Sequence, residues 1–179
     1  MIPPTEKLPN CTLRPFELTD AQPLFDILKD EDVLRFMPWK EPLPLERVQR
    51  FVQQQIRHWE DHPYGWWALE NLPGHEFMGW CGLQFLPETD QTEVGYLLGK
   101  KYWGKGIATE AAHASLAFGF DSVKLDRIVA LVHPDNHASI RVIEKQGMER
   151  DDRIQLWGMD LDRYSITSAK YMDLKRKSL

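Results

Sequence analysis

Two glycines separated by one lysine, Gly104 and Gly106, precede a run of residues that is helical in character throughout. The first N–H groups of a helix have no partner inside it and carry partial positive charge, so they favour anions. Glycine has no Cβ, which lets a phosphate approach the backbone closely. Lys100, Lys101 and Lys105 surround the glycines and add positive charge. The pattern predicts a site for an anionic ligand, and a tight turn into an ordinary helix is the alternative.

This glycine pattern differs from the two common nucleotide-binding motifs. A dinucleotide fingerprint would have a third glycine where Thr109 stands, followed by a strand and an acidic residue at a fixed distance. A P-loop has four residues between its glycines and then Gly-Lys-Ser or Gly-Lys-Thr, whereas only Lys105 lies between these two. Neither nicotinamide chemistry nor P-loop chemistry is therefore predicted.

A second helix start lies further along the chain, in the stretch HPDNHASIRVIEKQGM. Asn136, Ser139 and Ile140 occupy its beginning, and Arg141 and Lys145 are one turn apart on it. If the strands before both helices are adjacent and parallel, both helix starts open at the carboxyl edge of one sheet, where ligands bind in open α/β sheets. One extended anionic ligand would then contact both.

Hydrophobic periodicity and turn residues predict the elements that position these groups. Helices are expected from Thr19 or Asp20 to about Lys29, from Leu45 after Pro44 to about Trp59, from Gly106 to Asp121, and from Asn136 to Gln146. Strands are expected over Cys11–Phe16, 65–71, 77–86, Thr92–Gly99, Arg127–Val132, Glu149–Leu156 and Tyr164–Met172. Gly79 and Gly82, inside one strand, indicate a bulge or a close backbone neighbour. Antiparallel strands followed by a βαβα unit predict an α/β fold with a mixed sheet and helices on both faces.

The composition fits one globular domain spanning residues 1–179, with 42% apolar and 27% charged residues and no internal repeat or linker. A net charge of −5, with basic residues spread along the chain, argues against duplex nucleic acid as a partner. No secretory signal and no run of eighteen apolar residues occurs, so we expect a cytoplasmic protein without a membrane partner. Cys11 and Cys81 lack any C-x-x-C neighbour and fit a reducing compartment, each as a small buried residue.

Six histidines raise the question of a metal site. His58 and His62 are spaced one helical turn apart, but His62 precedes Pro63, where the helix is expected to have ended. No third ligand has usable spacing. No metal is therefore predicted.

The stretches YWGKGIATEA and NHASIRVIEKQGM resemble the two acetyl-CoA-binding motifs of the GNAT N-acetyltransferases, in particular the branch of ribosomal-protein N-terminal acetyltransferases. TLRPFELTDAQPLFDIL, VLRFMPW and TEVGYLLG extend the resemblance over nearly the whole chain. The resemblance implies the GNAT fold, a mostly antiparallel central sheet with a split between two parallel strands. It also implies acetyl-CoA as the cosubstrate.

The resemblance further implies which residues contact the cofactor. The strand Gly95 to Leu98 lends backbone groups to the pantetheine, and Trp103 to Thr109 wrap the pyrophosphate. Lys101 stands where the family pattern usually has Gln or Arg, which keeps a long polar donor. The expected cofactor-binding set comprises Tyr96, Leu97, Leu98, Lys101, Trp103, Gly104, Lys105, Gly106, Ile107, Ala108, Thr109, Asn136, Ser139 and Arg141.

Acetyl transfer to an amine requires removal of an amine proton, because a primary amine is mostly protonated at pH 7. Glu93 begins the strand that leads into VGYLLG, which would place its carboxylate at the mouth of the split, so it is the candidate base. The alternative is a solvated residue at a strand end. A backbone N–H near Leu97 or Leu98 is the candidate for polarising the thioester carbonyl.

The departing thiolate benefits from a proton donor. Many GNAT enzymes resemble one another in having a tyrosine seven residues past the motif asparagine, a place that Ile143 occupies in this sequence. Ser139 lies one turn earlier on the same side and is the candidate in its stead, with helix capping as the alternative. Because a thiolate leaves readily, the donor is expected to help modestly.

We therefore expect a cytoplasmic, acetyl-CoA-dependent N-acetyltransferase that works by direct attack of a primary amine, either a protein N-terminus or a small molecule, as a monomer or homodimer. A CoA-binding sensor or partner module on the same fold, without turnover, is the alternative. A covalent acyl-enzyme is disfavoured because neither cysteine has an adjacent histidine or asparagine pattern. Some of the seven tryptophans are expected to line an acceptor groove, and most to be core.

Overall fold

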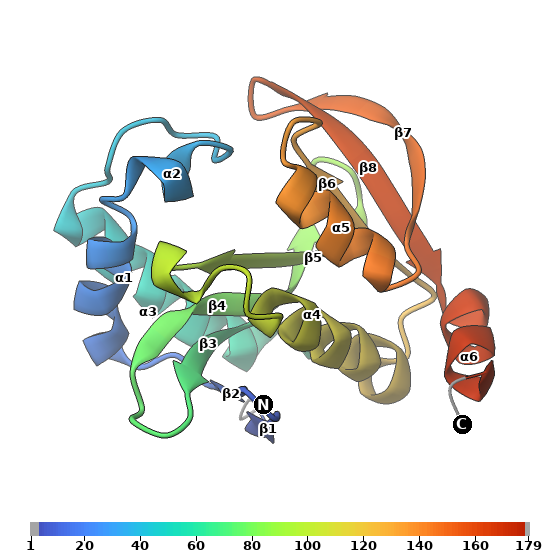
Figure 1. Cartoon of the computed structure of the whole chain (residues 1–179), viewed down its shortest axis with the longest axis horizontal. Helices are drawn as coiled ribbons and strands as arrows, with labels where there is room; N and C mark the ends of the chain where they lie inside the picture. The colour runs from blue at the N-terminus through green and yellow to red at the C-terminus, as the bar shows by residue number, and fades with distance from the viewer. Residues whose placement is uncertain (1–3, 178–179) are drawn as a thin grey trace.

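One sheet organises the part of the chain that the computed structural model describes, residues 4–177 (Figure 1). Its strands are β1 (Glu6–Lys7), β2 (Cys11–Arg14), β3 (Trp66–Asn71), β4 (Phe77–Leu86), β5 (Gln91–Leu98), β6 (Arg127–Val132), β7 (Glu149–Leu156) and β8 (Met159–Thr167). They lie in the order β1-β2-β3-β4-β5-β6-β8-β7. The neighbours β5 and β6 are parallel, and the other neighbouring pairs are antiparallel. The predicted mixed, mostly antiparallel sheet is confirmed.

Helices cover both faces of this sheet, as predicted. They are α1 (Ala21–Ile27), α2 (Glu31–Leu34), α3 (Leu45–Asp61), α4 (Ile107–Ala117), α5 (His137–Lys145) and α6 (Ser168–Lys177), with short turns η1 (Leu18–Asp20), η2 (Lys100–Tyr102) and η3 (Phe118–Val123). On one face, Leu24 of α1 and Val52 of α3 pack with Leu97 of β5. On the other face, Leu116 of α4 packs with Val94 of the same strand. The two faces of β5 therefore carry separate cores.

The parallel strands β5 and β6 pair briefly and then separate (Figure 1). Their ladder comprises the pair Glu93 and Val129. By contrast, β4 and β5 pair along the whole of β5. Past Glu93, therefore, the edge of β5 that faces β6 opens into the split between two parallel strands that the GNAT resemblance implied.

Gly79 and Gly82 have the close backbone neighbours that the sequence predicted. A Cβ on Gly79 would lie 1.9 Å from the carbonyl oxygen of Leu97, and one on Gly82 would lie 2.3 Å from that of Gly65. The register between β3 and β4 also shifts, so that Met78 is an extra residue beside Gly79. Glycine is required at both positions because the next strand or chain segment occupies the space of a side chain.

One predicted helix ends early in the structure, and another is divided. The helix expected to run to about Lys29 ends at Ile27, and the separate helix α2 follows, because the Asp30 carboxylate caps it by accepting the Asp32 N–H at 2.9 Å. The helix expected to run to Asp121 changes to the π-helical turn η3 after Ala117. The early end of α1 matters for function because it directs the chain after α2 over the split.

The predicted strand Tyr164–Met172 is confirmed over its first four residues and wrong over the rest, because β8 starts and ends earlier and α6 takes the last of these residues. Trp157 and Gly158 have positive φ angles of 52° and 73° and form the tight turn that brings β8 back along β7. α6 leaves the sheet and is held in place by Tyr171, which stacks on Phe120 with ring centroids 4.8 Å apart. Contacts distant in sequence thus decide where the strand ends.

Candidate active site

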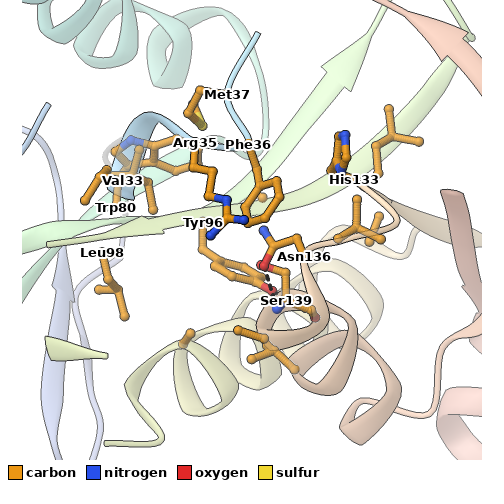
Figure 2. A pocket seen from close by; sticks show the side chains of 18 of the residues that line it. Val33, Arg35, Phe36, Met37, Trp80, Tyr96, Leu98, His133, Asn136 and Ser139 are labelled. Carbon is orange, nitrogen blue, oxygen red and sulfur yellow. Dashed lines mark hydrogen bonds between the residues drawn. The ribbon is translucent and has the colours of Figure 1, made fainter. Parts of the chain in front are cut away.

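A cavity of about 1050 Å³ occupies the split and continues over the sheet face that α1 and α3 cover. One wall is formed by the carboxyl ends of β5 and β6 and by the first turns of α4 and α5. The opposite wall is formed by the chain after α2, by α3 and by the turn between β7 and β8. Figure 2 shows Arg35 and Phe36 from the second wall facing Tyr96 and Asn136 from the first. The two predicted helix starts therefore do share one cavity.

Most of the residues expected to bind the cofactor or perform catalysis line this cavity. They are Glu93, Tyr96, Leu97, Leu98, Trp103, Gly104, Gly106, Ile107, Ala108, Thr109, Asn136, Ser139 and Arg141. Lys101 and Lys105 are not among the lining residues. Lys101 forms an ion pair with Glu76, and Lys100 forms one with Asp32. Two of the three lysines expected to supply positive charge are thus already neutralised by carboxylates.

The glycine turn before α4 leaves open space on the side where side chains would lie. Gly104 and Gly106 have positive φ angles of 72° and 80°, and a Cβ added at either would meet no protein atom within 4 Å. Gly106 is the N-cap of α4 and supplies no side-chain cap for the N–H groups of the first turn. The Trp103 indole donates to the Leu98 carbonyl at 2.8 Å, which ties this turn to the end of β5. The turn therefore presents backbone donors to open space.

The start of α5 is capped by Asn136. Its side-chain oxygen accepts the Ser139 N–H at 3.2 Å. Helix capping, the alternative role of Ser139, is therefore performed by a different side chain. Ser139 instead lies against Tyr96, whose hydroxyl donates to the Ser139 carbonyl at 3.3 Å.

Tyr96 contributes its side chain to the site, whereas the sequence analysis assigned a role only to its backbone. Burial raises the pKa of the Tyr96 phenol above its ordinary range, and a hydrogen bond with the Ser139 side chain lowers it in part. The Tyr96 phenol is therefore neutral and lies beside Ser139 at the start of α5. The tyrosine was missed because the family pattern directs attention to the helix, at Ile143, which is buried in the core.

Glu93 lies at the narrow end of the split, where β5 and β6 still pair, and not at its mouth. Its carboxylate accepts the Leu131 N–H at 3.3 Å. Burial raises the pKa of Glu93 to about 8, and the bond from Leu131 offsets part of that rise. A solvated residue at a strand end would have neither property. Glu93 is instead a partly buried acid inside the cavity.

Three tryptophans form an aromatic wall over β5. Trp66 and Trp80 stack with ring centroids 4.0 Å apart, and both rings lie over Gly95, which has no side chain to displace them. Trp39, from the chain after α2, also lines the cavity. Trp59 and Trp67, by contrast, are fully buried in the core. Trp103 and Trp157 also line the cavity, so five of the seven tryptophans do so and the expectation that most are core is wrong. That this part of the cavity binds the acceptor stays a prediction.

Arg35 and Phe36, in the chain after α2, were missed as residues that line the cavity. Figure 2 shows Arg35 pointing into the cavity, and Phe36 packs on His133 at the end of β6 with ring centroids 5.2 Å apart. This contact brings the chain after α2 across the split. In the sequence, FMPW with Trp39 belonged to the aromatic set of which some members were expected to line an acceptor groove, whereas Arg35 and Phe36 carried only the resemblance of VLRFMPW.

Neither a metal cluster nor a membrane-spanning helix is present within residues 4–177. His58 and His62 stack on each other with ring centroids 4.2 Å apart, and no group of three or more His, Cys, Asp or Glu side chains gathers around a common point in that range. No described helix combines the length and the apolar character needed to cross a bilayer.

Residues 10–149 match the family profile described as the acetyltransferase (GNAT) domain. An uncharacterised Bacillus subtilis protein, YkkB, is 33% identical over 87% of this chain and 91% of its own length. The N-acetyltransferase p20 of Bacillus licheniformis is 31% identical over 93% of this chain and 96% of its own length. The spermidine N(1)-acetyltransferase of Escherichia coli is more distant, at 26% identity over 75% of this chain and 70% of its own length.

Solved structures agree with this similarity. A GNAT-family acetyltransferase from Bacillus anthracis superposes with a TM-score of 0.79 at 26% identity, covering 93% of this chain and 99% of the other. A ribosomal-protein-S5-alanine acetyltransferase from Vibrio fischeri superposes with a TM-score of 0.78, covering 94% and 99%, at 17% identity. The second likeness concerns the fold alone.

Proposed function

The chain belongs to the GNAT acetyltransferases and is an N-acetyltransferase, and from this premise we propose that it transfers the acetyl group of acetyl-CoA to a primary amine by direct attack. The observation that carries the proposal is the single cavity that joins the glycine turn to Glu93. One end of it suits a phosphate-bearing donor. The other end holds a group able to accept the proton of an amine.

The residues at the first end fit CoA. The cradle above Gly104 and Gly106 is free of protein atoms, and the first turn of α4 has backbone donors for a pyrophosphate. Arg141 lines the cavity from α5 and supplies a cation to the same end. The edge of β5 beyond Glu93 would bind the amides of the pantetheine as a neighbouring strand does.

Bound acetyl-CoA supplies an acyl carbon activated as a thioester. In the proposed reaction the amine nitrogen bonds to that carbon, the carbon–sulfur bond breaks, and the bonding electrons leave with sulfur. A backbone N–H near Leu97 or Leu98 polarises the carbonyl oxygen. The protein's remaining task is to move two protons.

Glu93 takes the first proton. A carboxylate with its pKa raised to about 8 is a much stronger base than an ordinary one, and its affinity for a proton approaches that of an amine. Its place at the narrow end of the split sets it beside the position where the two substrates meet. The backbone bond from Leu131 fixes the orientation of the carboxylate.

The pair of Tyr96 and Ser139 supplies the second proton to the departing sulfur. Both residues line the cavity, and the raised pKa of the phenol keeps it protonated. Because CoA thiolate is a tolerable leaving group, we assign this pair a smaller share of the rate than Glu93.

The proposal is tested by measuring thiol release from acetyl-CoA in the presence of a panel of primary amines. We expect release that depends on the amine, with N-acetylated product identified by mass spectrometry. A CoA-binding module without turnover would bind CoA in calorimetry and release no thiol with any amine, and that outcome would contradict the proposal.

A further inference from the structure

The part of the cavity over the sheet face that α1 and α3 cover, here called the acceptor half, differs in chemistry from the part in the split that is assigned to CoA. The chain after α2 and the first turn of α3 contribute two guanidinium groups, Arg35 and Arg47. Neither forms an ion pair with any residue in the described range 4–177. Figure 2 shows the Arg35 side chain directed into the cavity. Two guanidinium groups without an ion pair among the described residues therefore line this half, and that of Arg35 also lies 5.3 Å from the centre of the Phe36 ring.

Carboxylates are scarce on the same walls. The acidic residues that line the cavity are Asp32 and Glu93. Asp32 is already paired with Lys100, and Glu93 is the proposed base. A polyamine carries further ammonium groups besides the one that reacts, and these need carboxylates or water around them. Here they would meet Arg35 and Arg47, and like charges at short range are unfavourable.

Two hydrogen-bond donors in this half also lack partners. The indole nitrogens of Trp39 and Trp66 are buried, and neither has a hydrogen-bond acceptor among the described residues. A buried N–H without an acceptor is costly, so an acceptor supplied by a ligand would be favourable. Aromatic rings supply apolar surface beside these donors. The ring centroid of Phe51 lies 5.7 Å from that of Trp66, and Trp80 stacks on Trp66.

We propose, on the basis of the function proposed above, that the acceptor is an α-amine with a carboxylate or carbonyl oxygen beside it and an apolar, preferably aromatic, side chain. The guanidinium groups and indole N–H groups bind the oxygen, the stacked tryptophans bind the side chain, and Glu93 receives the proton of the amine. A free aromatic amino acid and a peptide N-terminus share this chemistry. A polyamine lacks it, although a more distant relative is named for spermidine.

Four amines test separately the need for the oxygen beside the amine and the need for the aromatic side chain. They are L-phenylalanine, the tripeptide phenylalanyl-glycyl-glycine, 2-phenylethylamine, which keeps the ring and the amine but has no oxygen, and spermidine. We expect kcat/KM for phenylalanine or the tripeptide to exceed that for 2-phenylethylamine by at least ~10-fold. The better of the two identifies a free amino acid or a peptide N-terminus as the source. Equal rates with 2-phenylethylamine, or a preference for spermidine, would overturn the proposal.

Substitutions test whether the named residues cause the preference for phenylalanine over 2-phenylethylamine. Arg35→Met and Arg47→Met should each lower the ratio of phenylalanine to 2-phenylethylamine several-fold through KM, with CoA affinity unchanged. Arg50→Met is the matched control, because Arg50 is exposed on the same helix as Arg47 and does not line the cavity. Trp66→Phe keeps a ring and removes the N–H, and it should also lower that ratio. Loss of CoA affinity in Arg35→Met and Arg47→Met would assign the cations to the donor and contradict the proposal.

A binding measurement keeps this inference separate from acetyl transfer itself. Tryptophan fluorescence should report saturable binding of N-acetyl-L-phenylalanine in the presence of CoA and much weaker binding of N1-acetylspermidine. If the panel releases no thiol but this selectivity is found, acetyl transfer fails and the acceptor inference stands. If thiol is released but the selectivity is reversed, acetyl transfer stands and the acceptor inference fails.

Discussion

Glu93 has unusual acidity because of where the backbone places it. An ordinary glutamate at a strand end faces water, but here the neighbouring strand and the cavity walls remove that water, which raises the pKa to about 8. One hydrogen bond, from the backbone N–H of Leu131, does not reverse this rise in the pKa. The residue can therefore hold a proton near neutral pH and lose it slightly above.

The kinetic consequence is tested with Glu93→Gln. The amide keeps the size of the side chain and removes its basicity, so kcat/KM should fall ~10²–10⁴-fold at neutral pH while CoA affinity persists. The loss should shrink toward pH ~9–10, where more of the acceptor amine arrives neutral. If the pH–rate profile of Glu93→Gln overlays that of the parent, water and not Glu93 removes the proton of the amine. Glu60→Gln, at an exposed residue of α3, serves as the control.

The same pKa predicts a pH-dependent stability that needs no substrate. Between the ordinary value of 4.5 and about 8, the folded state keeps a proton on Glu93 that the unfolded chain loses, so stability falls as pH rises through this window. Glu93→Gln removes that penalty. Its stability relative to the parent should rise by on the order of 1–4 kcal/mol between pH 4.5 and 8. Denaturant midpoints at a series of pH values measure it, and a difference independent of pH would contradict the raised pKa.

The Tyr96 and Ser139 pair is tested by Tyr96→Phe and Ser139→Ala. If the pair protonates sulfur, each change lowers kcat by roughly 10-fold or less, and high pH gives no rescue, since the lost group is an acid. A leaving thiol of lower pKa in the acyl donor should reduce the deficit. Equal deficits with both donors would assign the pair a purely structural role.

At the scale of the element, the glycine turn before α4 is defined by an open space and by backbone angles. The positive φ of Gly106 disfavours any residue with a Cβ, while the space around it is empty of protein. Gly158 in the β7–β8 turn has a similar φ of 73° and equally open surroundings. A substitution there should cause the same backbone strain without blocking the proposed ligand site, so it separates the two effects.

Gly106→Val should cost ~1–3 kcal/mol in stability through backbone strain and also abolish measurable CoA binding, because the side chain enters the phosphate cradle. Gly158→Val should have a comparable stability cost with CoA affinity intact. Calorimetry of both folded variants distinguishes the two effects. If Gly106→Val binds CoA normally, the glycines serve the turn alone.

The whole molecule depends on two sheet halves joined at one parallel pair. A ligand that contacts both β5 and the starts of α4 and α5 should stabilise the two sheet halves relative to each other. At a concentration about a hundredfold above its dissociation constant, CoA should stabilise the fold by ~2.7 kcal/mol, or about 5–11 °C in Tm. NAD and ATP, which share the adenosine diphosphate but not the pantetheine, should give smaller shifts. Equal shifts with NAD in a thermal melt would count against the pantetheine-binding edge of β5.

The sequence by itself determined most of the elements and two helix starts that line the cavity. Hydrophobic periodicity and turn glycines are local signals, so β6 and β7 were predicted with their observed bounds, and the glycine turn and the Asn136 helix start were predicted to lie at one cavity, as they do. The family resemblance also predicted the split between the two parallel strands. These features depend on neighbours in the chain, which a sequence displays directly.

Only the tertiary structure decided the rest. The environment of Glu93 depends on how far β5 and β6 stay paired, and its raised pKa is a property of that enclosure. The pairing of Tyr96 with Ser139 joins a strand to a helix far along the chain. Arg35 enters the cavity only because α1 ends early and Phe36 reaches His133. Charge, burial and reach across the cavity are set by packing between distant segments, and periodicity along the chain carries no information about them.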